Sequence, residues 1–507
     1  MSKNIVYSLV LVFVLMGVFG LAFRVQRVEA SETIYIRSDG LVFPSDAPID
    51  RDGNIYTLTG DINDSIVVQK NDIVIDGAGL YTVHGLGDFD SIGMNLTGRS
   101  NVTIRNVKEI KEFGYGVLLN MSSNIFIFGS VLSANNRGGI YLSQASNSTI
   151  YGNNMTANMN YDVKLLQSSD NELYGNNLRR ILLEYSSNNN SVYGNDILVS
   201  GQEGVGLGWS ANNNVIFGNN IRGGLYGVHV FHASSQKILG NNITETNYGI
   251  YLDSSSSNVI SRNTVKNTTL GIFLHSCSEN TIFHNNFLDN ERNAFVFDSH
   301  LNLWDYGFPF GGNYWSNHTG VDSNEDGIGE SSHVLDEENR DNYPLMGMFS
   351  SFNTSLAEYV NVVSNSTVET FEYFENNGTI RIFVLNMTAE QTFGFCRVCI
   401  PHVLMSEPYN VTVNGANPIR WNYTLYDNGT HTWIYFVYEH STLEIVIIPE
   451  FPSYIALPIF MIATLLAVII YKTKRQSEQK VRFQTQMPQK KEEFAGEIAI
   501  GFKVAYL

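Results

Sequence analysis

Cysteine is scarce in this chain of 507 residues, and its scarcity narrows the possible classes of protein. The 3 cysteines are too few for a disulfide framework. Cys396 and Cys399 have the spacing of a redox or metal pair, but they lie in an alternating segment, where residues three apart face opposite sides. We therefore expect structural thiols, and a disulfide-rich scaffold is excluded.

Charged side chains are also few, at 16% of the chain, and acidic residues outnumber basic ones to give a formal net charge of -18. Such a chain repels phosphate backbones, which argues against a nucleic-acid partner. Asparagine, serine, glycine, tyrosine and phenylalanine are plentiful instead. This composition is typical of a β-rich extracellular protein.

An apolar run near the start of the chain indicates export. This run, residues 5–23, follows Lys3. The small residues Val28 and Ala30 come after it, on either side of Glu29. This order predicts a signal peptide over residues 1–30. The alternative is an uncleaved N-terminal anchor, because the run is close to spanning length.

A second apolar run, residues 454–471, carries no charge and is followed by Lys472 and further basic residues. Positive residues stay on the cytoplasmic side of a membrane. We therefore expect a transmembrane anchor over residues 450–472 and a cytoplasmic tail over residues 473–507. The sequence thus predicts a single-pass cell-membrane protein with the bulk of the chain extracellular, where its Asn-x-Ser/Thr sequons would make it a glycoprotein.

The middle of the chain repeats with a period of roughly 22 residues, which lies in the range of stacked arrays. Each repeat carries short alternating segments broken by glycine, asparagine and serine, too short and too rich in turn residues for helices. The apolar anchors of the repeat are Ile104, Ile127, Ile150, Leu173, Val192, Ile216, Ile238, Ile260 and Ile282.

An asparagine follows each anchor from Ile150 to Ile282 at the same distance. In stacked coils a side-chain amide can bond the same amide one coil away and so form a ladder. The repeats therefore predict an all-β fold, a right-handed parallel β-helix over residues 31–349 with coils ~4.8 Å apart. The asparagines of this column are Asn153, Asn176, Asn195, Asn219, Asn241, Asn263 and Asn285.

Residues 350–449 carry a different pattern. Their alternating segments, such as residues 379–385 and 433–438, are longer and are separated by turns that contain Asn-Gly. This pattern predicts a small β-sandwich, for which a stalk or spacer is the expected role.

The repeats and two flanking blocks carry a family resemblance. The opening block spans residues 50–79, and the closing block runs from Gly311-Gly-Asn-Tyr-Trp-Ser316 to Asp341-Asn-Tyr-Pro344. On these residues the chain resembles the NosD-like β-helix family, also described as carbohydrate-binding and sugar-hydrolysis β-helices, and it is most similar to archaeal surface members. The resemblance implies the right-handed β-helix fold first and a carbohydrate-related role second.

The closing block also contains a loop of alternating oxygen-bearing side chains that turns at Gly327, like the first half of a calcium loop. His333 stands where an EF-hand would place its last carboxylate, so the loop is no EF-hand. We expect it to hold calcium; the alternative is a turn that binds nothing. The expected ligands are Asp322, Asn324, Asp326, the carbonyl of Ile328, Glu330 and Asp336.

Aligning the coils places acidic residues in one outer column. Glu184, Asp253, His275 and Asp298 fall together in this alignment. Asp253 and Asp298 would then be two coils apart, or about 9.5 Å, near the carboxyl separation of inverting glycosidases. One hypothesis gives Asp253, Asp298 and His275 a catalytic role, and the other treats them as ordinary turn residues.

The same alignment groups aromatic side chains at the ends of successive strands. Tyr185, Trp209 and His232 form this first column. A second column, earlier in the same strands, contains Tyr141, His229, Tyr251 and Phe273. Outward aromatic rings can stack on sugar rings, and they can also simply cover the wall of a solenoid. The residues predicted to bind sugar are Tyr185, Trp209, His232 and Tyr251.

These patterns favour a cell-surface protein that binds an extracellular polysaccharide or a surface glycoprotein. They also favour a binding function over an enzymatic one. A polysaccharide hydrolase or lyase is the first alternative, and a structural envelope protein without a specific ligand is the second.

Copper handling, which the family name suggests, would need clustered Met, Cys and His ligands. His229 and His232 lie close in sequence, but no Met or Cys motif joins them.

Overall fold

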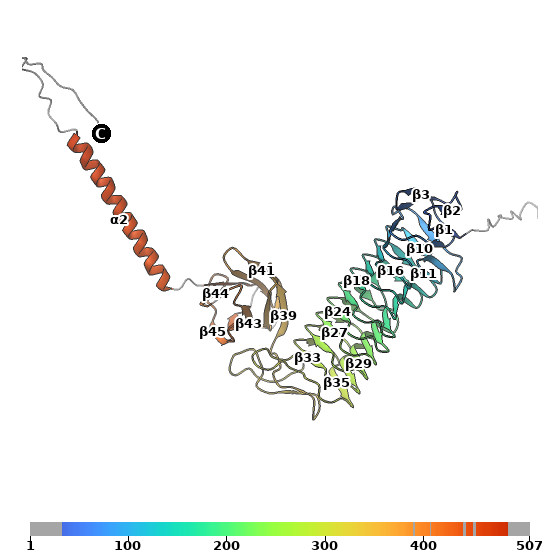
Figure 1. The fold of residues 1–507 in the computed structure, drawn as a ribbon. Helices are drawn as coiled ribbons and strands as arrows, with labels where there is room; N and C mark the ends of the chain where they lie inside the picture. Colours follow the sequence, from blue (N-terminus) through green and yellow to red (C-terminus); the bar gives the residue numbers. More distant parts are fainter. Residues whose placement is uncertain (1–32, 389–390, 406, 440–442, 450–452, 485–507) are drawn as a thin grey trace, which may run out of the picture.

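A computed structural model gives the fold of the protein. Figure 1 shows an elongated β-solenoid, a smaller β-domain beside its C-terminal end and a long helix, α2. The predicted signal peptide lies outside the described part of the chain. The structure describes residues 33–388, 391–405, 407–439, 443–449 and 453–484.

The solenoid is a right-handed parallel β-helix of about 11 turns, whose coils contribute strands to three sheets, here called sheets A, B and C. Sheet A contains β1 (Ile34–Ile36), β2 (Val42–Phe43), β5 (Ile66–Val68), β8 (Ile92–Asn95), β11 (Tyr115–Asn120), β14 (Gly138–Ser143), β17 (Tyr161–Leu166), β20 (Ile181–Glu184), β23 (Glu203–Gly208), β26 (Tyr226–Phe231), β29 (Tyr248–Asp253), β32 (Leu270–His275) and β35 (Arg292–Phe297). Sheet B contains β3 (Ile49–Asp52), β4 (Ile55–Leu58), β6 (Ile73–Asp76), β9 (Val102–Arg105), β12 (Phe126–Phe128), β15 (Thr149–Tyr151), β18 (Glu172–Tyr174), β21 (Ser191–Tyr193), β24 (Val215–Phe217), β27 (Lys237–Leu239), β30 (Val259–Ser261) and β33 (Thr281–Phe283). Sheet C contains β7 (Thr82–His84), β10 (Glu109–Lys111), β13 (Val131–Ser133), β16 (Asn154–Ala157), β19 (Asn177–Leu178), β22 (Asp196–Leu198), β25 (Asn220–Arg222), β28 (Asn242–Thr244), β31 (Thr264–Lys266), β34 (Asn286–Leu288) and β36 (Tyr314–Trp315).

The predicted anchors form the inner wall of sheet B. Ile127 pairs with Ile150, which pairs with Leu173, and all three are fully buried. The residues on either side of each anchor point outward, because side chains alternate along a strand. The prediction of an all-β, right-handed parallel β-helix is therefore confirmed.

The predicted asparagine column forms a continuous ladder inside the turn between sheets B and C. The side-chain amide of Asn195 donates to the Oδ1 of Asn219 at 2.9 Å, and Asn219 donates to Asn241 at 2.9 Å. A second ladder, which was not predicted, begins with Asn171, whose amide donates to Asn190 at 3.0 Å. Both ladders satisfy buried polar groups coil by coil, so each coil depends on its neighbours.

A short hairpin and a β-sandwich follow the solenoid. The sandwich sheets pack their apolar faces together, with Val362, Ile382 and Ile447 in the shared core. The hairpin is β37 (His333–Val334) and β38 (Arg340–Asp341). One sandwich sheet has the order β39 (Met348–Asn353), β40 (Tyr359–Ser364), β43 (Phe393–Pro401), β46 (His431–Glu439) and β45 (Arg420–Asp427). The other has the order β41 (Thr367–Phe374), β42 (Thr379–Leu385), β47 (Leu443–Pro449) and β44 (Tyr409–Val413).

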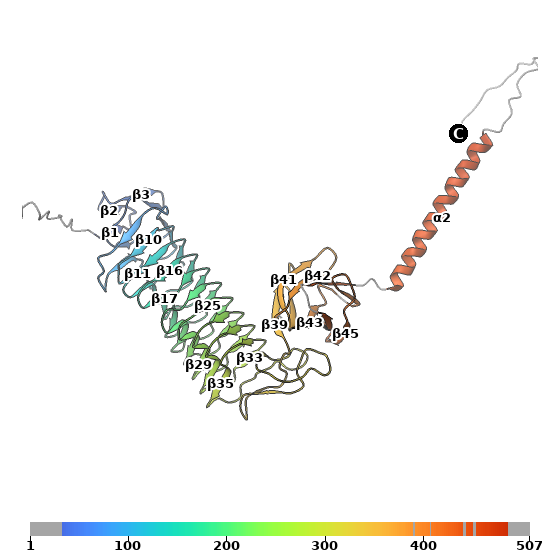
Figure 2. The same ribbon diagram turned by 180° about the vertical axis from the view of Figure 1, so that it is seen from behind.

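The sandwich lies against the C-terminal coils of the solenoid in both Figure 1 and Figure 2. Asn286 of β34 exchanges two hydrogen bonds with the backbone of Phe349, at 2.8 and 2.9 Å. Arg420 forms an ion pair with Glu325 of the closing block. The two parts are thus joined by specific polar contacts as well as by the chain itself.

The described chain continues in helix α2 (Ser453–Gln484), which contains the whole apolar run, residues 454–471, of the predicted anchor. Its apolar residues from Met461 to Tyr471 are exposed. Among the residues that the structure describes, none of the helices is both long enough and apolar enough to cross a membrane. The structure therefore does not support the predicted transmembrane anchor over residues 450–472.

The asparagine ladder predicts a large stability effect for one small substitution. Asn219→Ala removes the donor to Asn241 and to the Val192 carbonyl and leaves the amide of Asn195 without its acceptor. Each buried group left unpaired costs about 1–3 kcal/mol, so we expect a loss of about 3 kcal/mol or more.

Thermal unfolding followed by circular dichroism would measure this loss. Asn220→Ala is the matched control, because the neighbouring Asn220 is exposed and its side chain bonds only the exposed side chains of Asp196 and Asn242. Its effect should stay within about 0.5 kcal/mol. Equal unfolding midpoints for the two variants would contradict a stabilising role for the ladder.

Candidate functional site

Three aromatic side chains occupy one corner of the solenoid, just after strands β20, β23 and β26. We call Tyr185, Trp209 and His232 the corner column. Tyr185 and Trp209 stack with ring centroids 6.0 Å apart, and Trp209 lies 5.6 Å from His232. Tyr185 is 49% exposed and Trp209 46% exposed, so nearly half of each residue faces solvent. The predicted alignment of these three residues in successive coils is therefore confirmed.

The corner column has a left-handed backbone, with φ values of 50°, 53° and 49° at its three residues. Positive φ is unusual for a residue other than glycine and is strained for a bulky one. The same corner is held in other coils by smaller or more flexible side chains. These are Met121, Gln144, Gln167, Ser254 and Ser276.

A second row of rings lies on the outer face of sheet A beside the corner column. His229, Tyr251 and Phe273 are register partners, with ring centroids 4.9 and 4.8 Å apart. Burial lowers the pKa of His229, so this imidazole is neutral at physiological pH. The predicted column of these residues is confirmed, and it continues to Phe295 at 5.2 Å.

Three further aromatic residues, whose roles the sequence patterns did not reveal, complete this surface. Tyr226 lies 4.7 Å from His229 and 5.2 Å from Tyr248, and Phe231 meets the Trp209 ring edge-on at 5.0 Å. The repeated Tyr-Gly at the start of the sheet A strands was the available signal for the two tyrosines. We call the corner column together with these rings the aromatic surface.

The predicted acidic column is only partly correct. Glu184, Asp253 and His275 share a column, but His275 is paired with Phe297 in the last coil. Asp298 comes one residue later, at the corner, where it accepts a hydrogen bond from Ser276 at 3.1 Å. The prediction that Asp298 shares the column of Asp253 is therefore wrong, because a shift of one residue changes the direction of a side chain.

One close pair remains from the predicted catalytic group. His275 Nδ1 lies 3.1 Å from Asp253 Oδ1, and the hydroxyl of Tyr251 donates to Asp253 Oδ2 at 3.3 Å. Glu184 forms a separate ion pair with Lys164 at 2.8 Å. A carboxylate that orients a histidine can support acid–base chemistry, but this arrangement lacks the second facing carboxylate of a glycosidase.

The predicted calcium loop folds back on its own backbone. Asp322 accepts hydrogen bonds from the backbone N–H groups of Asp326 and Gly327 at 2.9 and 2.8 Å. Glu330 accepts from two further N–H groups of the loop, whereas Asp336 accepts from Asn339 in a separate turn. No group of three His, Cys, Asp or Glu side chains within the described residues is arranged to hold a metal ion.

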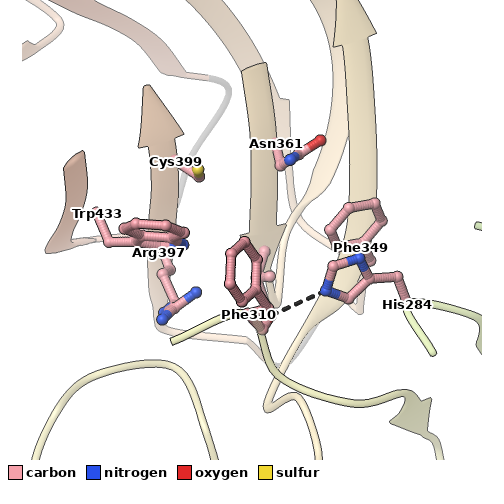
Figure 3. Close-up of a pocket in the computed structure, with 8 residues that line it drawn as sticks. His284, Phe310, Phe349, Asn361, Arg397, Cys399 and Trp433 are labelled. Atoms are coloured by element: carbon pink, nitrogen blue, oxygen red, sulfur yellow. Dashed lines mark hydrogen bonds between the residues drawn. The ribbon is translucent and has the colours of Figure 1, made fainter. Parts of the chain in front are cut away.

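A small pocket lies where the solenoid meets the sandwich (Figure 3). His284 stacks on Phe349 at 4.0 Å and lies 2.9 Å from the carbonyl of Phe310 through its Nε2 atom. Arg397 is buried on the sandwich side and donates to the carbonyl of Pro309 at 2.5 Å. The pocket is therefore a joint between the two domains, held together by buried polar contacts.

This joint predicts a loss of stability in acid. Burial lowers the pKa of His284 to about 4, below the value of about 6.5 expected in the unfolded chain. Stability from the neutral ring is thus complete above pH 6.5 and is lost as the pH falls toward 4. For one buried histidine the loss amounts to about 3 kcal/mol.

Unfolding midpoints between pH 8 and pH 4 would measure this loss in the native protein and in His284→Gln. The variant should lose part of the acid slope, whereas the exposed control His300→Gln should keep it. Asp341, whose pKa burial raises to about 7, acts with the opposite sign, so the difference between profiles isolates His284. Parallel profiles for the native protein and His284→Gln would contradict the assignment.

The fold and the aromatic surface define a parallel β-helix protein. Its interior side chains repeat from coil to coil, whereas its outward-facing side chains differ between coils. Two overlapping segments, residues 57–198 and 179–320, match the family described as periplasmic copper-binding protein (NosD). Together they cover just over half of the chain, and the chain belongs to the NosD family. The resemblance to this family seen in the sequence is confirmed.

Solved structures with similar folds are more distant. The periplasmic alginate epimerase AlgG is 11% identical with a TM-score of 0.39, over 50% of this chain and 80% of its own. The A-module of the Azotobacter vinelandii mannuronan C-5 epimerase AlgE4 is 15% identical with a TM-score of 0.35, over 49% and 88%. The tailspike gp49 of Acinetobacter baumannii bacteriophage Fri1, a capsular polysaccharide depolymerase, is 10% identical with a TM-score of 0.30, over 79% and 80%. At these values the likeness concerns only the general β-helix form. None of the curated proteins matches the chain.

The described residues do not fit copper, which the family description names. Copper prefers clustered sulfur and imidazole ligands. His229 lies among the rings of the sheet A face, whereas His232 lies at the corner beside Trp209. Cys277 is buried in the solenoid, and burial raises the pKa of its thiol to about 11. These side chains therefore do not form a copper site among the described residues.

Proposed function

We propose that the protein binds a carbohydrate chain across the aromatic surface of sheet A. The corner column is the observation that carries this proposal. Serine and glutamine hold the same left-handed corner in other coils, so the turn does not require aromatic residues. Burial does not require them either, because Tyr185 and Trp209 are nearly half exposed.

Stacked rings of this kind suit sugars. A pyranose ring offers one apolar face, and tyrosine and tryptophan combine a flat apolar surface with a polar group that can form hydrogen bonds. The corner column adds three rings in successive coils, and the row through Tyr251 lies beside it. A polysaccharide or the glycan of a surface glycoprotein is therefore the proposed ligand.

An extracytoplasmic location agrees with the periplasmic description of the family. Attachment of this protein to a cell surface rests on the sequence pattern alone. Fractionation of cells that express the full chain would test it, with recovery in the membrane fraction expected and recovery in the soluble exported fraction contradicting it.

Trp209→Ala tests the proposed function. We expect affinity for the bound glycan to fall about tenfold or more, because loss of a central aromatic contact costs at least about 1.4 kcal/mol. A screen of the full chain against immobilised glycans would identify the ligand, and calorimetry would give the affinities. Tyr174→Ala is the matched control, since Tyr174 belongs to a stacked row on sheet B.

The same screen separates binding from catalysis. New reducing or unsaturated ends that are lost in Asp253→Asn would replace the binding proposal with a polysaccharide hydrolase or lyase, for which the Asp253–His275 pair is the supporting observation. Failure to retain any glycan would favour the structural alternative.

Calcium remains a proposal for the loop at residues 322–330. Its carboxylate, amide and carbonyl oxygens suit a hard cation, and Gly327 has the positive φ of 79° needed at the turn. Calorimetric titration with calcium should give a saturable signal that is lost in Asp326→Ala. Absence of heat in the native protein would contradict the proposal.

A further inference from the structure

One coil of the solenoid is shorter than its neighbours. The number of residues between successive asparagines of the ladder gives the length of each coil, because the ladder hydrogen bonds join equivalent positions in neighbouring coils. Asn153 to Asn176 spans 23 residues and Asn195 to Asn219 spans 24, but Asn176 to Asn195 spans only 19. The missing residues come from the turn between β19 and β20, where only Arg179 and Arg180 connect the two strands.

An unusual residue lies directly beside this short turn. The second position of the long sheet A strands is glycine in most coils, because a Cβ there would strike the next coil. A Cβ on Gly139 would lie 2.7 Å from the carbonyl of Asp162, and one on Gly227 would lie 2.6 Å from that of Gly249. Asp162 occupies this glycine position in its own coil. The short coil provides the space that its side chain needs.

These two departures from the repeat create a recess of about 340 Å³ in the outer wall. The fully buried carboxylate of Asp162 accepts hydrogen bonds from Asn158 Nδ2 at 2.9 Å and from the backbone N–H of Arg179 at 2.6 Å. Burial raises the pKa of Asp162. Arg180 is paired with Glu203 at 2.7 Å on the other side of the recess.

Arg179 forms the longer of the two ion pairs in the recess, with the buried carboxylate of Asp162. Its Nη2 atom contacts the Asn158 carbonyl and lies 3.6 Å from Asp162 Oδ1, which is too long for a hydrogen bond. Its Nη1 atom has no hydrogen-bond partner within the described residues, and Arg179 is one of the residues that line the recess. A guanidinium with free N–H groups matches the two oxygens of a carboxylate. Such a site is unexpected in a chain of net charge -18.

The recess and the corner column lie at the two ends of the same strand. Arg179 and Arg180 precede β20, and Tyr185 follows it. Four strand residues span about 13 Å. The next strand carries Gly206 beside Leu182, so no large side chain rises from β23 at this place. An oligosaccharide lying across the sheet can therefore reach both features.

We propose that the bound carbohydrate is acidic and that the recess receives the carboxylate of a uronic acid unit on Arg179. This inference rests on the proposed function of the aromatic surface and specifies its substrate class. The corner column stacks on the apolar face of the sugar chain. Arg179 distinguishes an acidic chain from a neutral chain of the same shape.

Three polymers test this inference on the full chain by calorimetry: polygalacturonate, the same polymer with its carboxyl groups reduced to alcohols, and dextran sulfate. The native protein should bind polygalacturonate at least about tenfold more tightly than the reduced polymer. Arg179→Gln should abolish this preference. The control Arg222→Gln removes the same charge from an exposed position on β25 and should leave it unchanged.

Glu203→Gln is expected to raise the affinity for the acidic polymer instead of lowering it, and a folding defect cannot produce that effect. It releases Arg180 from its ion pair and should strengthen binding of polygalacturonate while leaving the reduced polymer unaffected. Trp209→Ala should weaken both polymers equally. These variants therefore separate recognition of charge from stacking on the ring.

The outcomes distinguish the two proposals. Equal binding of both polymers by the native protein, or an unchanged preference in Arg179→Gln, would overturn the acidic recess while leaving carbohydrate binding intact. Failure to bind either polymer would overturn the acidic recess, and failure to retain any glycan in the screen would overturn both proposals. Binding of dextran sulfate alone, lost in Arg179→Gln, would replace the carboxylate with a sulfate ester and overturn the uronic acid assignment.

Discussion

Hydrogen bonding from coil to coil is the interaction on which the rest of this structure depends. A coil cannot satisfy its own backbone, so it pairs with the coil above and the coil below. The two asparagine ladders extend the same rule to side chains in the buried turns, where Asn219 both accepts from one coil and donates to the next. The interior is therefore uniform, and variation is confined to the outer wall and the corners.

This confinement explains where the candidate sites lie. The corner after the sheet A strands keeps a left-handed backbone whichever side chain it carries, so Trp209 can stand where other coils have serine or glutamine. The recess arises in the opposite way, through a change of coil length. Asp162 can replace glycine only because the following turn is short enough to leave room for its side chain.

The sandwich and the closing block are linked to the solenoid by buried polar groups. Arg397 reaches across to the Pro309 carbonyl, and His284 of the last sheet B turn packs against Phe349 (Figure 3). Burial holds the pKa of Arg397 at about 10 and that of His284 at about 4. The joint therefore loses stability when His284 is protonated, while the aromatic surface lies on a different face of the solenoid.

The sequence by itself determined the stacking of coils, since Ile127, Ile150 and Leu173 recur at one inward position and the asparagines at another. It also determined the aromatic columns, because the recurring apolar anchors show which residues of successive coils align. Only the tertiary structure placed Asp298 at the corner instead of opposite His275, and only it brought Asp162 beside Arg179. The physical reason is that a strand reverses the direction of its side chains at each residue, so local register decides which groups meet.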